Sequence, residues 1–187
     1  MNLLKVLFIS LLALFVACSG QNDASSVSND IEFPFYDLKS FFQSEINRLN
    51  KQQPSVEKKV AIQENIEQKT LEQLDYEQEL QAFVDADINR VAWFDQYQID
   101  TTFSQSQIQG LSYTALSEKL KTRTIQINFS KDGTIQQVQI YIGRKSSVAG
   151  SIKQLTYEPQ KGYTIATTQS LIGTSDKEIT LEVTFLN

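Results

Sequence analysis

The chain has 187 residues, of which 17 are basic and 22 acidic, and it contains no histidine and one cysteine. The acidic balance argues against a nucleic-acid partner, which would require a strongly basic surface. Without histidine, the commonest general base and metal ligand is missing, and one cysteine excludes an intrachain disulfide and a multi-cysteine zinc site. We therefore expect no metal and no other cofactor.

The first 17 residues are typical of an export signal. Lys5 belongs to a short basic start, and residues 6–17 are apolar except for Ser10. A run of this length is too short to span a bilayer as a helix, which needs about 20 residues, but it fits the apolar core of a signal peptide. The run ends in Phe15-Val16-Ala17-Cys18, after which the sequence turns polar.

These four residues resemble the lipobox of bacterial type II signal peptides, and the chain is similar in style to small lipoproteins of Bacteroidota. The resemblance implies cleavage after residue 17 and lipidation of Cys18, with a diacylglyceryl thioether and usually a further acyl chain such as palmitate. Two or more acyl chains hold a protein stably on a membrane. Cys18 is then a lipid anchor and not a nucleophile. The alternative is a type I signal peptide with an incidental cysteine.

Residues 18–30 follow as the lipidated cysteine and a flexible tether, because small and polar side chains cannot repay the entropy of ordering. One globular domain is expected over 31–187. Surface-exported lipoproteins of Bacteroidota often carry an acidic cluster after the cysteine, and here residues 19–23 hold one acid, Asp23. We expect an outer-membrane anchor with the domain in the periplasm, and surface exposure is the alternative.

The first part of this domain has helical periodicity. Apolar residues at spacings of three and four predict a helix, on Leu38, Phe41, Phe42, Ile46 and Leu49. Residues 56–66 are ambiguous, and weak alternation favours a first strand there. Thr70 and Gln73 match a capping box, which predicts a second helix over 70–90. The pattern does not assign residues 95–109.

The later part alternates between apolar and polar residues. Ile125, Ile127 and Phe129 alternate with polar residues, Asp132-Gly133 predicts a hairpin, and residues 179–185 alternate most regularly. Short connections and half-polar strands predict an α+β fold in which two N-terminal amphipathic helices pack on a C-terminal antiparallel β-meander. One version is a curved, half-barrel-like sheet, which is similar at the level of the fold to bacterial lipoprotein carriers and receptors.

Three aromatic residues, Trp93, Phe94 and Tyr97, form the densest group of rings in the unassigned region. Aromatic rings suit a sugar or lipid site, so they are candidate ligand-binding residues. The alternative, which the sequence favours, is that they are part of the core and seal a helix against the sheet. Trp93 and Tyr97 are four residues apart, which would place them on one face of a helix.

The other patterns are weaker. Asp85, Asp87 and Asn89 begin like a calcium loop, but Arg90 and Gln96 stand where an EF-hand needs glycine and glutamate. Lys119, Lys121 and Arg123 form a small basic stripe, which suits a phosphate or an acidic glycan. They share a face with Ile125 only if a strand runs through them, so we expect the strand to begin after Arg123 or a bulge to change its phase.

Paired carboxylates remain as a catalytic possibility. A glycosidase needs two acids about 5–10 Å apart across a cleft, and several acids crowd the predicted second helix, namely Glu72, Asp75, Glu77 and Glu79. Acids on a helix usually form a solvated face, and the sequence favours this interpretation of them. The sequence favours a non-enzymatic, membrane-anchored envelope lipoprotein that binds a protein partner or an apolar ligand, and the alternative is a carboxylate-based glycan hydrolase.

Overall fold

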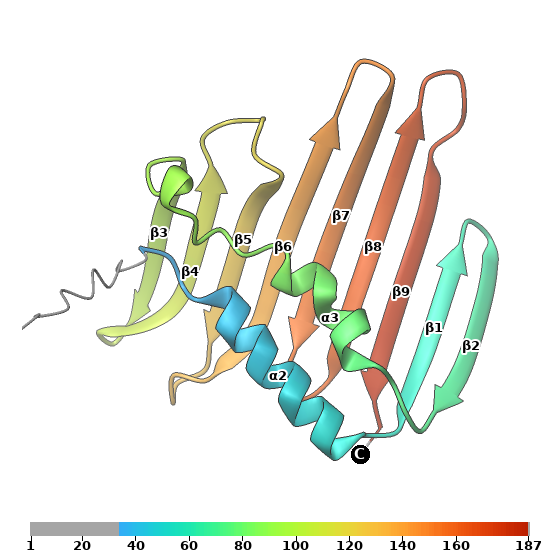
Figure 1. Cartoon of the computed structure of the whole chain (residues 1–187). Coiled ribbons are helices and arrows are strands. Elements are labelled where there is room, and N and C mark those ends of the chain that lie inside the picture. The colour runs from blue at the N-terminus through green and yellow to red at the C-terminus, as the bar shows by residue number, and fades with distance from the viewer. Residues whose placement is uncertain (1–33, 187) are drawn as a thin grey trace, which may run out of the picture. The chain divides into compact units, whose positions relative to one another are not determined.

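The computed structural model describes residues 34–186, which belong to the second of the two units into which the chain divides, Phe33–Asn187. The predicted signal peptide, Cys18 and the tether lie outside the described residues. The elements in chain order (Figure 1) are α2 Leu38–Gln52, β1 Val56–Ile62, β2 Asn65–Leu71, α3 Tyr76–Val84, a 3-10 turn η1 Val91–Trp93, β3 Tyr97–Ser104, β4 Gln107–Ala115, β5 Thr122–Phe129, β6 Ile135–Lys145, β7 Ala149–Glu158, β8 Gly162–Leu171 and β9 Lys177–Phe185.

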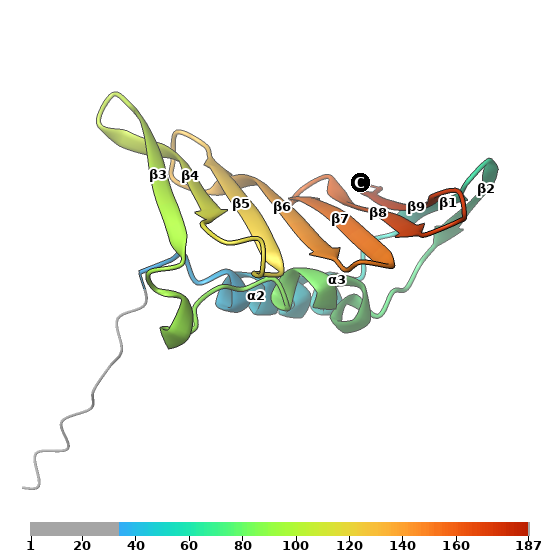
Figure 2. The ribbon, with the colours of Figure 1, turned by 90° about the horizontal axis from the view of Figure 1, so that it is seen from above.

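All strands of the described residues belong to one antiparallel sheet in the order β2-β1-β9-β8-β7-β6-β5-β4-β3. Strands β3 to β9 form a meander, in which each strand pairs with its neighbour in the sequence. The hairpin β1–β2 joins the sheet at β9, where Val56 lies opposite Phe185 and Ile62 lies opposite Ile179. Figure 2 shows α2 and α3 on the same face of this sheet.

The α+β class is confirmed, but the predicted arrangement of the elements is wrong. The sheet begins at Val56 and is not confined to the C-terminal part of the chain, and the hairpin β1–β2 separates the two helices in sequence. The strand predicted within 56–66 is confirmed as β1. The reason for the error is that β1 finds its partner in β9, more than a hundred residues later, which no local pattern can show.

Helix α2 forms where it was predicted. Asp37 caps it by accepting a hydrogen bond from the Ser40 backbone N–H at 2.9 Å. The helix ends at Gln53, which adopts a positive φ of 41° and returns its N–H to the carbonyl of Leu49. The residues that it buries are Leu38, Phe42, Ile46 and Leu49. One apolar stripe therefore packs inward and the polar face stays in solvent.

The second helix is shorter than predicted. Thr70 lies in β2, opposite Glu57 of β1, so the expected capping box does not form. Asp75 caps α3 instead and accepts from the Gln78 backbone N–H. Residues 65–71 pair along their whole length with β1, and this pairing overrides the helix start that Thr70 and Gln73 predict.

The unassigned region 95–109 contributes to a hairpin, β3–β4. Its two-residue turn, Gln105 and Ser106, has φ of 49° and 65°. This is the backbone of the tight turns that match the twist of paired strands. The register shifts between Thr102 and Phe103, which marks a bulge. The turn lacks glycine, which is why the usual sequence signal is missing.

The core lies between the helices and the sheet. Its centre is a cluster of rings in which Phe42 of α2 lies 4.9 Å from Phe83 of α3 and 5.2 Å from Tyr157 of β7, measured between ring centroids. Phe83 also contacts Tyr163 of β8, at 6.3 Å. On the other face of the sheet the strands are polar, as at Gln126, which is exposed between buried Ile125 and Ile127. The predicted half-polar strands are confirmed.

Candidate functional site

Two of the three predicted aromatic residues pack together, Tyr97 within the core and Phe94 partly buried against it. Phe94 and Tyr97 both contact the ring of Phe35, at centroid distances of 6.3 Å and 5.6 Å. Burial raises the pKa of Tyr97 to about 12, and its hydroxyl donates to the carbonyl of Thr122 at 2.8 Å. These contacts are the ones expected if the aromatic residues form part of the core rather than a ligand site.

Trp93 lies in η1 and is half-buried. The Arg90 guanidinium carbon lies 4.5 Å from the centre of its ring, which is a cation–π contact. Trp93 and Tyr97 do not share a helix face, because Tyr97 begins β3. Ligand binding by Trp93, Phe94 and Tyr97 stays a prediction.

The predicted basic stripe does not act as one unit. The register of β5 against β6 shifts between Thr122 and Thr124, so a bulge changes the phase at Arg123. Arg123 donates to the carbonyl of Ser117 at 2.9 Å and thereby holds the β4–β5 connection. Lys121 lies before β5, on the other side of this bulge. The expected change of phase is confirmed, and it separates Lys121 from Arg123.

The segment that begins like a calcium loop is a polar turn. The carboxylate of Asp87 accepts from the backbone N–H groups of Lys39 and Asn89, at 3.2 Å and 2.9 Å. Within residues 34–186 no group of three or more acidic, histidine or cysteine side chains is placed to hold a metal ion.

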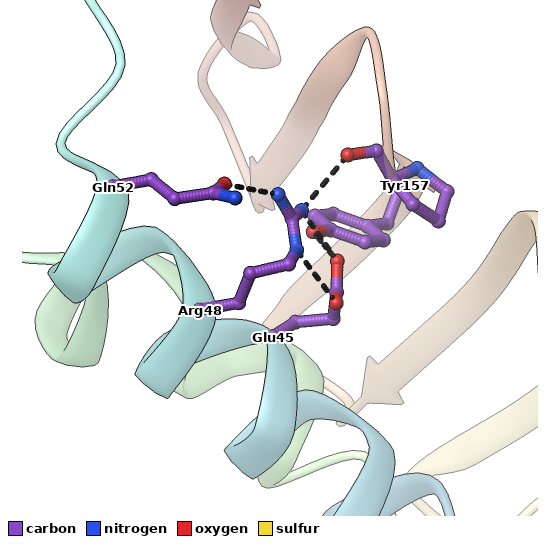
Figure 3. A network of polar contacts seen from close by, with 5 residues as sticks. Glu45, Arg48, Gln52 and Tyr157 are labelled. Carbon is purple, nitrogen blue, oxygen red and sulfur yellow. Dashed lines mark hydrogen bonds and ion pairs between the residues drawn. The ribbon is translucent and has the colours of Figure 1, made fainter.

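A carboxylate that the sequence did not single out, Glu45 of α2, lies at the boundary between helix and sheet (Figure 3). Arg48 donates two hydrogen bonds to it, at 3.0 Å and 2.8 Å, and the Tyr157 hydroxyl donates a third at 2.5 Å. The guanidinium also reaches the carbonyl of Pro159 and the side chain of Gln52. The hydrogen bonds and the charge of Glu45 raise the pKa of Arg48.

Glu79 of α3 occupies an equivalent position on the second helix. It pairs with Lys58 of β1 and accepts from the Tyr163 hydroxyl at 2.7 Å. Tyr163 lies directly opposite Tyr157 in the pairing of β7 and β8. Burial, and then the charge of the neighbouring carboxylate, raises the pKa of both tyrosines.

Both carboxylates therefore join a helix to the sheet. A general acid or base needs a free proton site facing a substrate. Each carboxylate is instead engaged by a cation and a tyrosine hydroxyl, so the arrangement is one of structural support. Of the acids that the sequence singled out, Asp75 caps α3 and Glu72 accepts from the hydroxyl of Ser55.

A different surface, at one end of the sheet, lies away from these contacts. Four connections lie along this end, which we call the turn end (top of Figure 1): β1–β2 (63–64), β4–β5 (116–121), β6–β7 (146–148) and β8–β9 (172–176). Each bears or adjoins an exposed large apolar side chain. The exposed fractions are 61% for Ile66, 63% for Leu116, 59% for Val148 and 71% for Ile172.

Hydrogen bonds tie three of these connections to one another. The Ile172 N–H donates to the carbonyl of Val148 at 3.0 Å, and the Gln63 N–H donates to the carbonyl of Glu178 at 3.0 Å. The Gln63 side chain also donates to the carbonyl of Asp176. Val148 and Ile172 are thus displayed from backbone segments that hydrogen-bond to each other.

The opposite end of the sheet differs. The β5–β6 connection is polar throughout, Ser130-Lys131-Asp132-Gly133-Thr134, and so is most of β7–β8, Pro159-Gln160-Lys161. Hydrogen bonds from Ser130 and Thr134 lower the pKa of Asp132 to about 2. Exposed apolar residues at this end include Phe103 and Ile108 of the β3–β4 hairpin and Leu186, which follows β9.

Two hollows adjoin each other at the turn end. The first is an apolar cleft of about 470 Å³ between the β6–β7 and β8–β9 hairpins, with Val148, Leu171 and Ile172 among its walls. The second is a basic pocket of about 380 Å³ at the end of α3. Its lining residues are Ala82, Asp85, Lys121, Ile142, Arg144, Ser151 and Lys153. Arg144 and Ser151 line both hollows.

Sequence reasoning missed this surface apart from Lys121, which belonged to the predicted basic stripe. The apolar residues lie in or beside turns, where periodicity gives no signal, and Arg144 and Lys153 lie in separate strands. The signal that would have pointed to it is the presence of Val148, Leu171 and Ile172 within segments that otherwise have turn composition.

Comparison of the chain with protein-family models, curated proteins and solved structures finds no match. Within the described part of the chain, neither helix has the length and apolar character needed to cross a membrane.

Proposed function

We propose that the chain is a bacterial envelope lipoprotein, anchored through lipid on Cys18, whose domain binds a protein partner or an apolar ligand through the turn end without catalysing a reaction. We place the anchor in the outer membrane and the domain in the periplasm. The observation that carries the binding role is the row of hydrogen-bonded connections displaying Val148, Ile172 and their apolar neighbours.

Clustered apolar side chains on a surface mark interaction sites, whereas scattered ones are ordinary. A fixed display also lowers the entropy that is lost on binding. Val148, Leu171 and Ile172 are clustered because they line one hollow, and backbone hydrogen bonds join Val148 to Ile172 and Gln63 to Glu178.

A half-barrel carrier would hold its ligand between sheet and helices. The rings of Phe42, Phe83 and Tyr157 pack in that space. This favours binding at the turn end over enclosure within the fold. The hydrolase alternative has less support, because Glu45 and Glu79 are engaged by cations and tyrosines and line neither hollow of the turn end.

The anchor is tested by labelling cells with a palmitate analogue. The full chain should incorporate the label, and a Cys18→Ser variant should not. Mass spectrometry of the mature N-terminus should find acylated Cys18 as the first residue. An unmodified N-terminus elsewhere would overturn the lipoprotein assignment.

The binding role is tested by placing a photo-crosslinking side chain at position 148 or 172 of the full chain in cells. The matched control is position 160, an exposed residue of the opposite end. We expect an adduct of one defined mass from 148 and 172 and none from 160. Equal labelling from all three positions would contradict the proposal.

A further inference from the structure

The basic pocket gathers three cations from separate parts of the chain. Lys121 precedes β5, Arg144 lies in β6 and Lys153 in β7. Lys153 lies opposite Ile142 and Arg144 lies opposite Ser151, so these side chains occupy neighbouring rows on the face of the sheet that carries α3. The chain has a net charge of −5, so a group of three cations gives this pocket a charge of the opposite sign.

The charge of the pocket is only partly compensated. None of the ion pairs or hydrogen bonds within residues 34–186 engages the side chains of Lys121, Arg144 or Lys153. The one acid in the lining, Asp85, already accepts from the Gln81 side chain at 2.8 Å. The C-terminal end of α3 adds roughly half a negative charge. Three cations therefore face one carboxylate and a helix end, and the pocket remains positive.

A second observation indicates what kind of anion would fit. Because the basic pocket shares Arg144 and Ser151 with the apolar cleft, a charged site and an apolar site are continuous. Each hollow has a volume in the range of small-molecule sites, about 300–1,000 Å³. A ligand that occupies both must carry a negative charge at one end and an apolar portion at the other.

We propose that these two hollows bind an anionic amphiphile, with its phosphate or carboxylate group among Lys121, Arg144 and Lys153 and its apolar portion along Val148, Leu171 and Ile172. This inference rests on the proposed function, because the apolar portion uses the turn end. Arg144 provides a planar donor that suits two oxygens of a phosphate or carboxylate, and Lys121 and Lys153 provide point charges.

The test uses the full lipidated chain, kept in solution with neutral dodecyl maltoside and titrated with dodecyl phosphate under native mass spectrometry. The two amphiphiles share an alkyl chain and differ in the head group. We expect one dodecyl phosphate to be retained per chain. Arg144→Gln and Lys153→Gln should each weaken its binding at least about tenfold, which corresponds to about 1.4 kcal/mol.

Lys131→Gln is the matched control, because Lys131 is an exposed cation of the opposite end, and it should leave binding unchanged. Since the three cations have no partner in the described part of the chain, their variants should melt at the wild-type temperature. Unchanged retention in the combined variant of Lys121, Arg144 and Lys153 would overturn the proposal. Inorganic phosphate that binds as tightly as dodecyl phosphate would overturn its apolar part.

Two further arms separate the sources of the head group. In nanodiscs of phosphatidylglycerol, but not of phosphatidylcholine, protection of amides 146–151 from hydrogen exchange would assign the anion to a lipid of the bilayer. Binding of dodecyl phosphate without such protection would assign it to a free amphiphile. If crosslinking at 148 and 172 persists while dodecyl phosphate does not bind, the inference fails and the proposed function stands.

Discussion

The part of the sheet under the helices and the turn end are built from the same strands, but they differ in which side chains are exposed and which have partners. Under the helices, Glu45 and Glu79 are partly buried and each has a cation and a tyrosine hydroxyl as partners. At the turn end, apolar side chains are exposed and the cations of the basic pocket have no partner within the described residues. Charged groups that have partners within the fold indicate a structural role. Exposed apolar side chains and cations without such partners indicate a binding surface.

The largest effect should follow from opening the ring cluster under the helices. Phe42→Ala removes a fully buried ring that contacts Phe83 and Tyr157, and it should lower the free energy of unfolding by about 3–5 kcal/mol. Urea denaturation measures this. Phe103→Ala removes the same ring from an exposed site and should change stability by less than about 0.5 kcal/mol. Similar losses in both variants would remove the distinction between the regions.

A smaller effect is expected at the polar contacts beneath α2. Glu45→Ala leaves the Arg48 guanidinium and the Tyr157 hydroxyl without their shared acceptor, and it should cost about 2 kcal/mol. The matched variant is Glu77→Ala, an exposed carboxylate of α3, for which we expect a change below about 0.5 kcal/mol. Thermal and urea unfolding compare the two. A Glu45→Ala protein as stable as the wild type would contradict the structural role.

The same contacts predict a dependence on alkaline pH. The pKa values of Tyr157 and Tyr163 are raised in the folded protein by burial and by Glu45 and Glu79. Their stabilisation is complete below the unfolded pKa of about 10, and it is lost as the pH rises above that value. Each tyrosine should contribute a slope of about 1.4 kcal/mol per pH unit. Stability measured from pH 9 to 11 should fall less steeply in Tyr163→Phe than in wild type.

The smallest effect on stability should come from the turn end. Val148→Ser combined with Ile172→Ser alters side chains that are 59% and 71% exposed, so the free energy of unfolding should change by less than about 0.5 kcal/mol. The same pair of substitutions should weaken binding of dodecyl phosphate, because both side chains line the apolar cleft. A loss of stability of several kcal/mol would show that Val148 and Ile172 stabilise the fold as core residues do, which would contradict a binding role for the turn end.

The sequence predicted those parts of the fold that local rules determine. Helix α2 has a complete apolar stripe and a capping aspartate, and Asp132-Gly133 forms the β5–β6 turn as expected. Prediction from the sequence failed where pairing with a neighbouring strand determines the secondary structure. Thr70 and Leu71 begin the predicted helix but lie in β2, because residues 65–71 pair along their length with β1, which in turn pairs with β9. The turn at Gln105-Ser106 was missed because neither residue is glycine.

The candidate site was less accessible to sequence reasoning. Lys121, Arg144 and Lys153 are separated by 23 and 9 positions in the chain and become neighbours only through the register of β5, β6 and β7. The stripe of three cations that the sequence did show is divided by a bulge at Arg123. A pattern along the chain cannot reveal a cluster that depends on register.

The position of β1 between β2 and β9 also has a consequence for the time course of folding. Val56 pairs with Phe185, so the N-terminal hairpin has its second neighbour only when the last strand exists. A chain made at about 5–20 residues per second needs on the order of ten seconds to extend from the end of β2 to the end of β9. Contacts between such distant residues also slow the folding reaction itself. The sheet therefore cannot be completed before β9 has been made, and until then the β1–β2 hairpin lacks its neighbour in the sheet.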